Sequence, residues 1–223
     1  MNPKVKGNRG KGAFCLGIVV LLWSLLAMTA LADPVPTATL AVPGESFIGE
    51  NFTFTVTFDN TSPTDPGYGP YIDLIFPVTG QDGDDGVDFV SANYLGAPVT
   101  AIELAFPAGG CVNHPYAVDN TGTPVQVCGT PGDKLVVLQL PFGSFTNDQP
   151  PAQVTVNATL SNKADLGIPL AIQARAGFQY GSDPLNNPTT DPSIIGTWTS
   201  QNVTPILMTL TKTYLGPEDE TAT

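Results

Sequence analysis

A dense group of acidic side chains is the part of this sequence best suited to metal chemistry. The segment 81–88 is rich in aspartate, and hard cations such as Ca²⁺ prefer several carboxylate and carbonyl oxygens on one loop. The spacing is wrong for an EF-hand, which needs an acid or amide at its fifth position and Gly at its sixth, where this segment has Gly86 and Val87. The Asp-Gly pairs favour the alternative, a solvated turn. The candidate calcium ligands are Asp82, Asp84 and Asp88, with Asp85 in reserve.

A single histidine limits the nucleophilic mechanisms open to the chain. Any Ser-His-acid or Cys-His mechanism would have to use His114. Its neighbours are Asn113 and Pro115, and the sequence contains no Gly-x-Ser-x-Gly motif. A pair of carboxylates could be brought together by folding, as in a glycosidase, but nothing in the sequence selects one. We therefore expect no catalytic residue, no enzymatic activity and no cofactor other than the candidate calcium ion.

Aromatic side chains could form a platform for a sugar ring, because their faces stack on flat apolar surfaces while a hydroxyl or ring nitrogen bonds a polar group. Tyr68 and Tyr71 flank a Gly-Pro loop, and we expect them to be exposed and to be the ligand contacts. The alternative is that these aromatic residues belong to the core or its rim. The full set of candidates is Tyr68, Tyr71, Tyr94, Tyr180 and Trp198.

The N-terminal segment 1–32 has the features of a secretory signal peptide. Four basic residues precede an apolar run, and Ala30 and Ala32 precede Asp33 with the spacing that signal peptidases prefer. The alternative is an uncleaved anchor, because the apolar run approaches the roughly 20 residues that span a bilayer. The sequence predicts an extracellular or cell-surface protein whose mature chain begins at Asp33.

Two cysteines remain once this segment is removed, because Cys15 lies within the apolar run. Cys111 and Cys128 form an even pair in an exported chain, which predicts one disulfide bond. Closing a loop of this length would stabilise the fold by about 3 kcal/mol in the chain-entropy model.

The charge of the mature chain excludes two classes of partner. The leader takes four of the 8 Lys and Arg residues and none of the 20 Asp and Glu residues, which leaves 4 − 20, or −16. Such a surface repels phosphate backbones and anionic lipid headgroups. We expect binding neither to nucleic acid nor to membrane lipid.

Alternating apolar and polar residues dominate the chain after residue 50. Phe52, Phe54, Val56 and Phe58 alternate with threonines, which predicts a strand with one buried face. With 22 prolines and frequent Gly, Asn and Asp between such runs, helix should be minimal and a β-sandwich is favoured. Further strands are predicted over 71–76, 89–94, 102–106, 134–140, 154–160, 169–180 and 206–214.

Three motifs share a pattern: Gly44-Glu45-Ser46, the Thr-rich run from Glu50 to Asn60, and Ile72-Asp73-Leu74-Ile75-Phe76-Pro77. Together they resemble the conserved repeat domain of unknown function that occurs in tandem in large bacterial cell-surface proteins. The resemblance implies an all-β fold, an immunoglobulin-like antiparallel β-sandwich, used as an extracellular spacer or adhesive module. The disulfide loop and the length of the domain depart from the usual single repeat.

The predicted organisation is a signal peptide over 1–32, a β-sandwich domain over 33–205, and a segment 206–223 that begins a following repeat or forms a linker tail. The predicted function is that of a non-enzymatic structural or adhesive module of a bacterial cell-surface protein, with surface glycans or other surface proteins as partners. The alternative is a stand-alone secreted module that binds carbohydrate or calcium.

Overall fold

The computed structural model divides into two compact units, Met1–Ala32 and Asp33–Thr223. It describes residue 1 and residues 33–81, 83–183, 192–208 and 212–213. The predicted signal peptide, Asp82 and most of segment 206–223 therefore lie outside the described residues. All regular elements of the described chain are strands, so the predicted all-β class is confirmed. None of the described residues forms a helix long and apolar enough to cross a membrane.

The first sheet has five antiparallel strands around β3, the Thr-rich run identified in the sequence. Phe54, Val56 and Phe58 of β3 are buried and alternate with less buried threonines, as predicted. The neighbours of β3 are β1 and β13. The strand order is β1 (Pro36–Ala41), β3 (Asn51–Asn60), β13 (Ala152–Leu160), β6 (Val87–Tyr94) and β7 (Ala97–Pro98).

The second sheet has seven strands and places β5 near its centre, between β14 and β11. All pairs in it are antiparallel except β2 with β16, which run parallel. The main order is β2 (Glu45–Phe47), β16 (Thr199–Ile206), β14 (Leu170–Phe178), β5 (Pro70–Phe76), β11 (Lys134–Gln139) and β8 (Thr100–Ala105), with β15 (Ile194–Ile195) beside β14. A separate short pair joins β4 (Gly67–Tyr68) to β12 (Ser144–Phe145).

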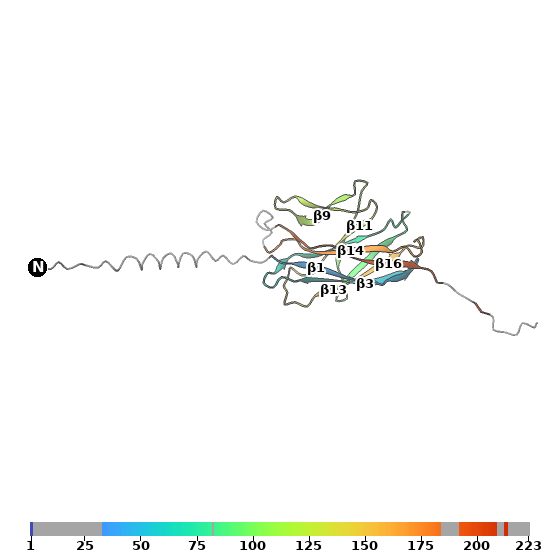
Figure 1. Ribbon diagram of the computed structural model, residues 1–223, viewed down its shortest axis with the longest axis horizontal. Helices are drawn as coiled ribbons and strands as arrows, with labels where there is room; N and C mark the ends of the chain where they lie inside the picture. The colour runs from blue at the N-terminus through green and yellow to red at the C-terminus, as the bar shows by residue number, and fades with distance from the viewer. Residues whose placement is uncertain (2–32, 82, 184–191, 209–211, 214–223) are drawn as a thin grey trace, which may run out of the picture. The chain divides into compact units, whose positions relative to one another are not determined.

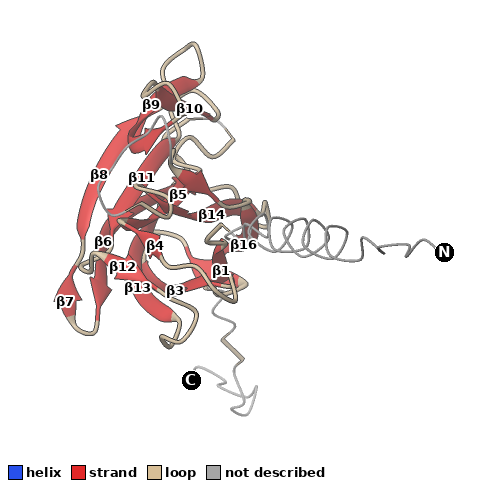
Figure 2. Cartoon of the chain, turned by 90° about the vertical axis from the view of Figure 1, so that its left-hand side faces the viewer, coloured by secondary structure: helices blue, strands red, loops and turns tan. Residues whose placement is uncertain are grey.

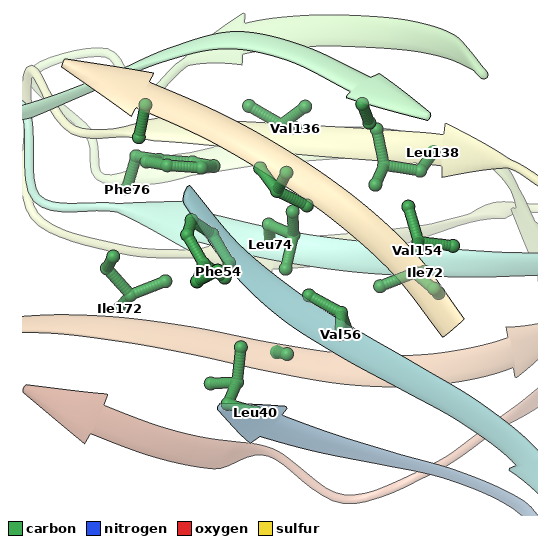
Figure 3. Packing of buried hydrophobic residues seen from close by; sticks show 14 of the residues in the cluster. Leu40, Phe54, Val56, Ile72, Leu74, Phe76, Val136, Leu138, Val154 and Ile172 are labelled. Atoms are coloured by element: carbon green, nitrogen blue, oxygen red, sulfur yellow. The ribbon is translucent and has the colours of Figure 1, made fainter. Parts of the chain in front are cut away.

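The two sheets pack face to face around one apolar core. Side chains from β3 and β5 point toward one another there, with Phe54 and Val56 on one side and Ile72, Leu74 and Phe76 on the other (Figure 3). Because each strand contributes every second side chain to this layer, the alternation in the sequence is sufficient to build it.

A third layer covers the other face of the second sheet. Strands β9 (Cys111–Val118) and β10 (Pro124–Cys128) form an antiparallel hairpin, which lies beside β11 (Figures 1 and 2). A second apolar cluster joins the hairpin to the sheet, with Ala117 and Val127 packing against the outer side chains of β5 and β11. Every residue of β5 is therefore buried, which corrects the prediction that Tyr71 is exposed.

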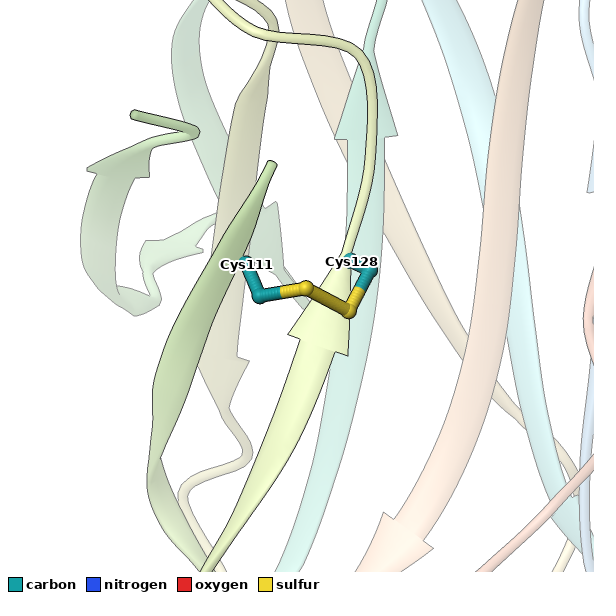
Figure 4. The surroundings of a disulfide bond; sticks show 2 residues. All are labelled: Cys111 and Cys128. Atoms are coloured by element: carbon teal, nitrogen blue, oxygen red, sulfur yellow. A yellow bond between two sulfur atoms is a disulfide. The ribbon is translucent and has the colours of Figure 1, made fainter. Parts of the chain in front are cut away.

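The predicted disulfide bond closes this hairpin at its open end. Cys111 and Cys128 face each other in the β9–β10 register and are joined by a bond of 2.06 Å (Figure 4). At the opposite end Asp119 shapes the turn, because its carboxylate accepts bonds from the backbone N–H groups of Thr121 and Thr123 at 2.8 and 3.0 Å. The Thr121 hydroxyl bond, followed by these two amide bonds, lowers the pKa of Asp119.

The C-terminal strand differs from the prediction. A strand was expected over 206–214, whereas β16 ends at Ile206 and begins at Thr199. The Thr, Gln and Asn residues of its exposed face mask the alternation in the sequence. Residues 207 and 208 are irregular and exposed.

Candidate functional site

A buried carboxylate lies between the second sheet and the hairpin. Asp73 is 0% exposed, and β5 turns it toward the hairpin because the neighbouring residues Ile72 and Leu74 face the inner core. The register of β5 with β14 places Arg175 directly opposite Asp73. The Arg175 Nε–H donates to Asp73 Oδ2 at 2.8 Å, so the buried negative charge has a counterion.

His114 reaches the other oxygen of this carboxylate from strand β9. Its Nε2 lies 2.8 Å from Asp73 Oδ1. Its Nδ1 accepts bonds from the backbone N–H groups of Tyr116 and Ala117, at 3.0 and 2.6 Å. Because two donors point at Nδ1, the hydrogen bonds assign the ring proton to Nε2, which donates to Asp73.

Aromatic rings complete the site. The Arg175 guanidinium carbon lies 4.4 Å from the ring centroid of Trp198, a cation–π contact, and the Tyr71 ring lies 4.7 Å from that of His114. Gly177 makes room for Tyr71, since a Cβ at that position would lie 2.2 Å from Tyr71 Cζ. We call these five residues the hairpin anchor: Tyr71, Asp73, His114, Arg175 and Trp198.

Two polar atoms of the hairpin anchor are buried without a hydrogen-bond partner among the described residues, Tyr71 Oη and Arg175 Nη2. Burial raises the pKa of the Tyr71 hydroxyl far above its ordinary value. The Asp73 carboxylate raises it further, and the Arg175 charge opposes both effects. Tyr71 is therefore held in its neutral form.

This geometry favours a structural role over a catalytic one. Both ring nitrogens of His114 are engaged by fixed partners, so neither is available to take a proton from a nucleophile. The carboxylate accepts from two different elements, and removing one partner of such a pair leaves an uncompensated buried charge. The hairpin anchor therefore fastens β9 to β5 and β14.

Sequence reasoning identified His114 but missed Asp73, to which it bonds, and Arg175, which bonds the same carboxylate. Asp73 is the one charged residue in the apolar run Tyr71–Phe76. A charge in a strand that is otherwise apolar is a signal, because it must find a partner if the strand is buried on both faces. Arg175 gives the matching signal in β14.

The acidic segment is only partly described, and it uses its carboxylates in different ways. Asp84 is exposed with φ 57°, while Asp85 is buried and accepts a bond from the Gln81 backbone N–H at 3.0 Å. Asp88 lies 3.2 Å from Lys134 Nζ. Within the described ranges no group of three potential metal ligands occurs, but Asp82 lies outside them, and the calcium site stays a prediction.

Lys134 joins both sheets through two ion pairs. Its Nζ lies 3.2 Å from Asp88 Oδ1 on β6 and 3.3 Å from Glu103 Oε2 on β8. Partial burial lowers the pKa of Lys134, but the bonds to Asp88 and Glu103 outweigh it, so that the net shift is upward.

The structure does not bring the aromatic residues proposed for sugar binding together at one site. Tyr71 is 1% exposed and cannot reach a ligand at the surface. Tyr94 packs against Phe142 at 5.6 Å, and Trp198 lies against Arg175. Tyr68 is half-buried on β4 and is the remaining member of the predicted contact pair.

Tyr180 lies beside Tyr68 and lines a small surface pocket. The Tyr180 backbone N–H donates to the Tyr68 carbonyl at 3.1 Å, and the pocket has a volume of about 280 Å³. Its lining combines aromatic and amide side chains, from Phe142, Gln139, Gln179 and Tyr180.

A larger groove lies beside strands β2 and β16 and was not predicted. It has a volume of about 600 Å³ and is lined by residues 43–52 in part and by 206–208. Phe47, Leu207 and Met208 are 41%, 57% and 73% exposed there. The sequence signal was present in Ile206-Leu207-Met208, but it was attributed to a strand.

The comparisons with known proteins identify no family. No family model matches the chain, and no curated protein matches it. The predicted resemblance to the tandem surface repeat is thus supported only by the sandwich fold that the structure shows.

Three solved structures illustrate the range of distant matches. A cohesin module from the Clostridium perfringens ATCC13124 family 33 glycoside hydrolase shares 12% identity over 78% of this chain and 99% of its own, with a TM-score of 0.45. AvmM, which catalyses macrocyclization in alchivemycin A biosynthesis, shares 13% over 80% and 92%, with a TM-score of 0.43. AggA, the major subunit of aggregative adherence fimbriae type I from Escherichia coli, shares 11% over 80% and 98%, with a TM-score of 0.31. Sequence identities and TM-scores this low do not indicate a function for this chain.

Proposed function

We propose that this protein is an exported, non-enzymatic structural or adhesive module of a bacterial cell-surface protein. The observation that carries the proposal is the hairpin anchor. His114, Asp73 and Arg175, the residues best suited to chemistry, bind one another beneath the hairpin, where they stabilise the fold.

Other features fit a module that works outside the cytoplasm. The Cys111–Cys128 bond requires an oxidising compartment to persist, and the predicted signal peptide would deliver the chain there. The charge of −16 over the mature chain (4 − 20) favours solubility and disfavours nonspecific association. Surface loops on such a rigid sandwich are the expected positions for contacts with glycans or other surface proteins.

The first test is the mass and cell fraction of the native protein, detected on producing cells with an antibody against Asp33–Met208. We expect a band much larger than 23.3 kDa in the envelope fraction, as for one module of a larger surface protein. A band of about 20 kDa in the medium, the size that removal of a signal peptide leaves, would contradict this and support a stand-alone secreted module.

A second candidate function is carbohydrate binding at the pocket that Tyr180 lines. Phe142 and Tyr180 supply ring surface, and Gln139 and Gln179 supply amide groups, the combination that orients a sugar ring. A glycan array tests it, with Tyr180→Ala as the variant and Phe47→Ala, an exposed aromatic residue outside this pocket, as the control. Binding that survives Tyr180→Ala would count against this pocket.

Calcium binding by the acidic segment is tested separately by thermal unfolding in millimolar CaCl₂ and MgCl₂. Selective stabilisation by calcium that disappears in Asp84→Ala would support the predicted site. An unchanged unfolding temperature would argue for a solvated turn.

A further inference from the structure

The groove beside β2 and β16 lies within a larger exposed apolar patch. Phe47, Leu207 and Met208 line it. Leu166 and Ile168, 53% and 41% exposed, flank Gly167, whose backbone N–H donates to the Pro205 carbonyl at 2.9 Å. Five large exposed apolar side chains thus gather around the end of β16. A soluble monomer seldom leaves such side chains gathered in one place without a partner.

The groove also carries negative charge without a local counterion. Glu45 and Glu50 line it and are exposed, and neither forms an ion pair within the part of the chain that the structure describes. Among the residues that the structure describes, no lysine or arginine lines the groove. Its surface therefore suits a segment with apolar side chains around one positive charge.

The chain itself contains such a segment directly after the groove. Residues 209–215 read Thr-Leu-Thr-Lys-Thr-Tyr-Leu. In an extended conformation Leu210, Lys212 and Tyr214 would share one face, with the cation between two apolar side chains. Lys212 is exposed and is likewise without an ion pair to any described residue.

We propose that the groove binds the segment Thr209–Leu215 of a second copy of this protein. The segment of the same copy is the less suitable occupant, because Leu207 and Met208 already line the groove and the chain would have to reverse immediately after them. No Gly or Pro occurs from 209 to 215 to make that turn. Residues rich in Thr, Leu and Tyr favour continuation as an extended strand.

Such contacts join two different surfaces, the groove of one copy and the tail of the next. An interface of this kind is heterologous, so it continues into chains of copies unless the rotation between copies closes a ring. The Glu45 and Glu50 carboxylates would pair with the Lys212 ammonium group of the neighbour at the rim. At physiological salt the Debye length is about 8 Å, which screens the long-range repulsion between acidic copies and leaves this close pair.

The test is sedimentation equilibrium of residues Asp33–Thr223, the compact unit that contains every described strand. We expect the average mass to rise with protein concentration. Lys212→Glu should weaken the association at least about tenfold, because it places like charges together, and Glu50→Lys should do the same. Mixing the two variants should restore association, since the acidic tail of the first variant then meets the basic groove of the second. Val90→Lys, at an exposed apolar position outside the groove, is the matched control and should leave association unchanged.

A second measurement identifies the occupant. A chain that ends at Met208 retains all described strands and should stay monomeric, yet bind a synthetic Thr209–Leu215 peptide. A monomeric full unit together with peptide binding to the shortened chain would mean that each tail fills its own groove, which overturns the proposal. Association that survives truncation, or failure of the peptide to bind, would overturn it as well.

Discussion

The two faces of strand β5 pack against different parts of the molecule, one entirely apolar and one partly polar. Ile72, Leu74 and Phe76 enter a core that is apolar throughout. On the other face, Tyr71 and Asp73 meet a smaller cluster, an ion pair and a hairpin closed by a disulfide bond. We call the core between the two sheets the inner layer, and the region between the second sheet and the β9–β10 hairpin the outer layer. The inner layer is stabilised by removal of apolar surface from water, whereas the outer layer also needs contacts between particular partners.

This difference between the two faces shows how the small β9–β10 hairpin is held on the larger second sheet. A two-stranded hairpin is marginally stable by itself, and β9–β10 buries few apolar side chains of its own. The disulfide bond fixes its open end, and His114 fixes its middle to Asp73. We expect the outer layer to depend on single residues far more than the inner layer does.

Of the substitutions considered, removing the charge of Asp73 should cause the largest loss of unfolding free energy. In Asp73→Asn the Arg175 charge loses its buried counterion, and we expect unfolding free energy to fall by about 3–5 kcal/mol, measured by urea denaturation. Asp148→Asn, at an exposed carboxylate with no partner in the described part of the chain, is the control and should change it little. A loss below about 1 kcal/mol, the value of an exposed ion pair, would show that the pair does not hold the layers.

Replacing both cysteines should cause the second-largest loss of stability. Cys111→Ser combined with Cys128→Ser opens a loop with a sequence separation of 17 and should reduce the unfolding free energy by about 3 kcal/mol. Hydrogen exchange sharpens the comparison, because amides of β9 and β10 should lose protection while those of β3 and β13 retain it. Equal loss in both regions would mean that the outer layer does not open separately.

Alkaline pH should destabilise the fold through the buried hydroxyl of Tyr71. Because the pKa of Tyr71 is raised in the folded state, its contribution to stability is complete below the ordinary tyrosine pKa of about 10 and is lost as the pH rises above it. Tyr71→Phe removes this loss, so the variant should become the more stable protein at alkaline pH. At pH 7 we expect a change within about 1 kcal/mol, since the hydroxyl has no described partner. Parallel pH profiles for both proteins would contradict this.

Most of the inner layer could be predicted from the sequence, because local patterns of apolar residues determine its strands. The period-two pattern of β3 identified Phe54, Val56 and Phe58 as buried, and the runs at β11, β13 and β14 were placed within a few residues. Strands β3, β13 and β14 each show one apolar face, whereas β11 is recognised from the continuous apolar run 135–138, which is buried throughout.

The outer layer could not be predicted in the same way. The burial of Tyr71 depends on a hairpin distant in sequence, and β9 contains Asn113, His114 and Pro115, which conceal its strand character. The Asp73–Arg175 pair spans 102 positions, so that only the sheet register brings it together. The groove beside β16 was missed because apolar residues at 206–208 indicate a strand equally well.

Substituting Lys134 should cause the smallest loss of unfolding free energy, and it gives the most direct contrast with Asp73. It also bonds two partners from separate strands, Asp88 and Glu103, but all three side chains are partly exposed to water, which weakens the attraction between their charges. Lys134→Met should therefore lower the unfolding free energy by at most about 1 kcal/mol, and the loss should shrink in 1 M NaCl, whereas the loss in Asp73→Asn should persist because salt cannot enter the buried site. If Lys134→Met costs as much as Asp73→Asn, burial does not explain why the hairpin anchor holds the outer layer.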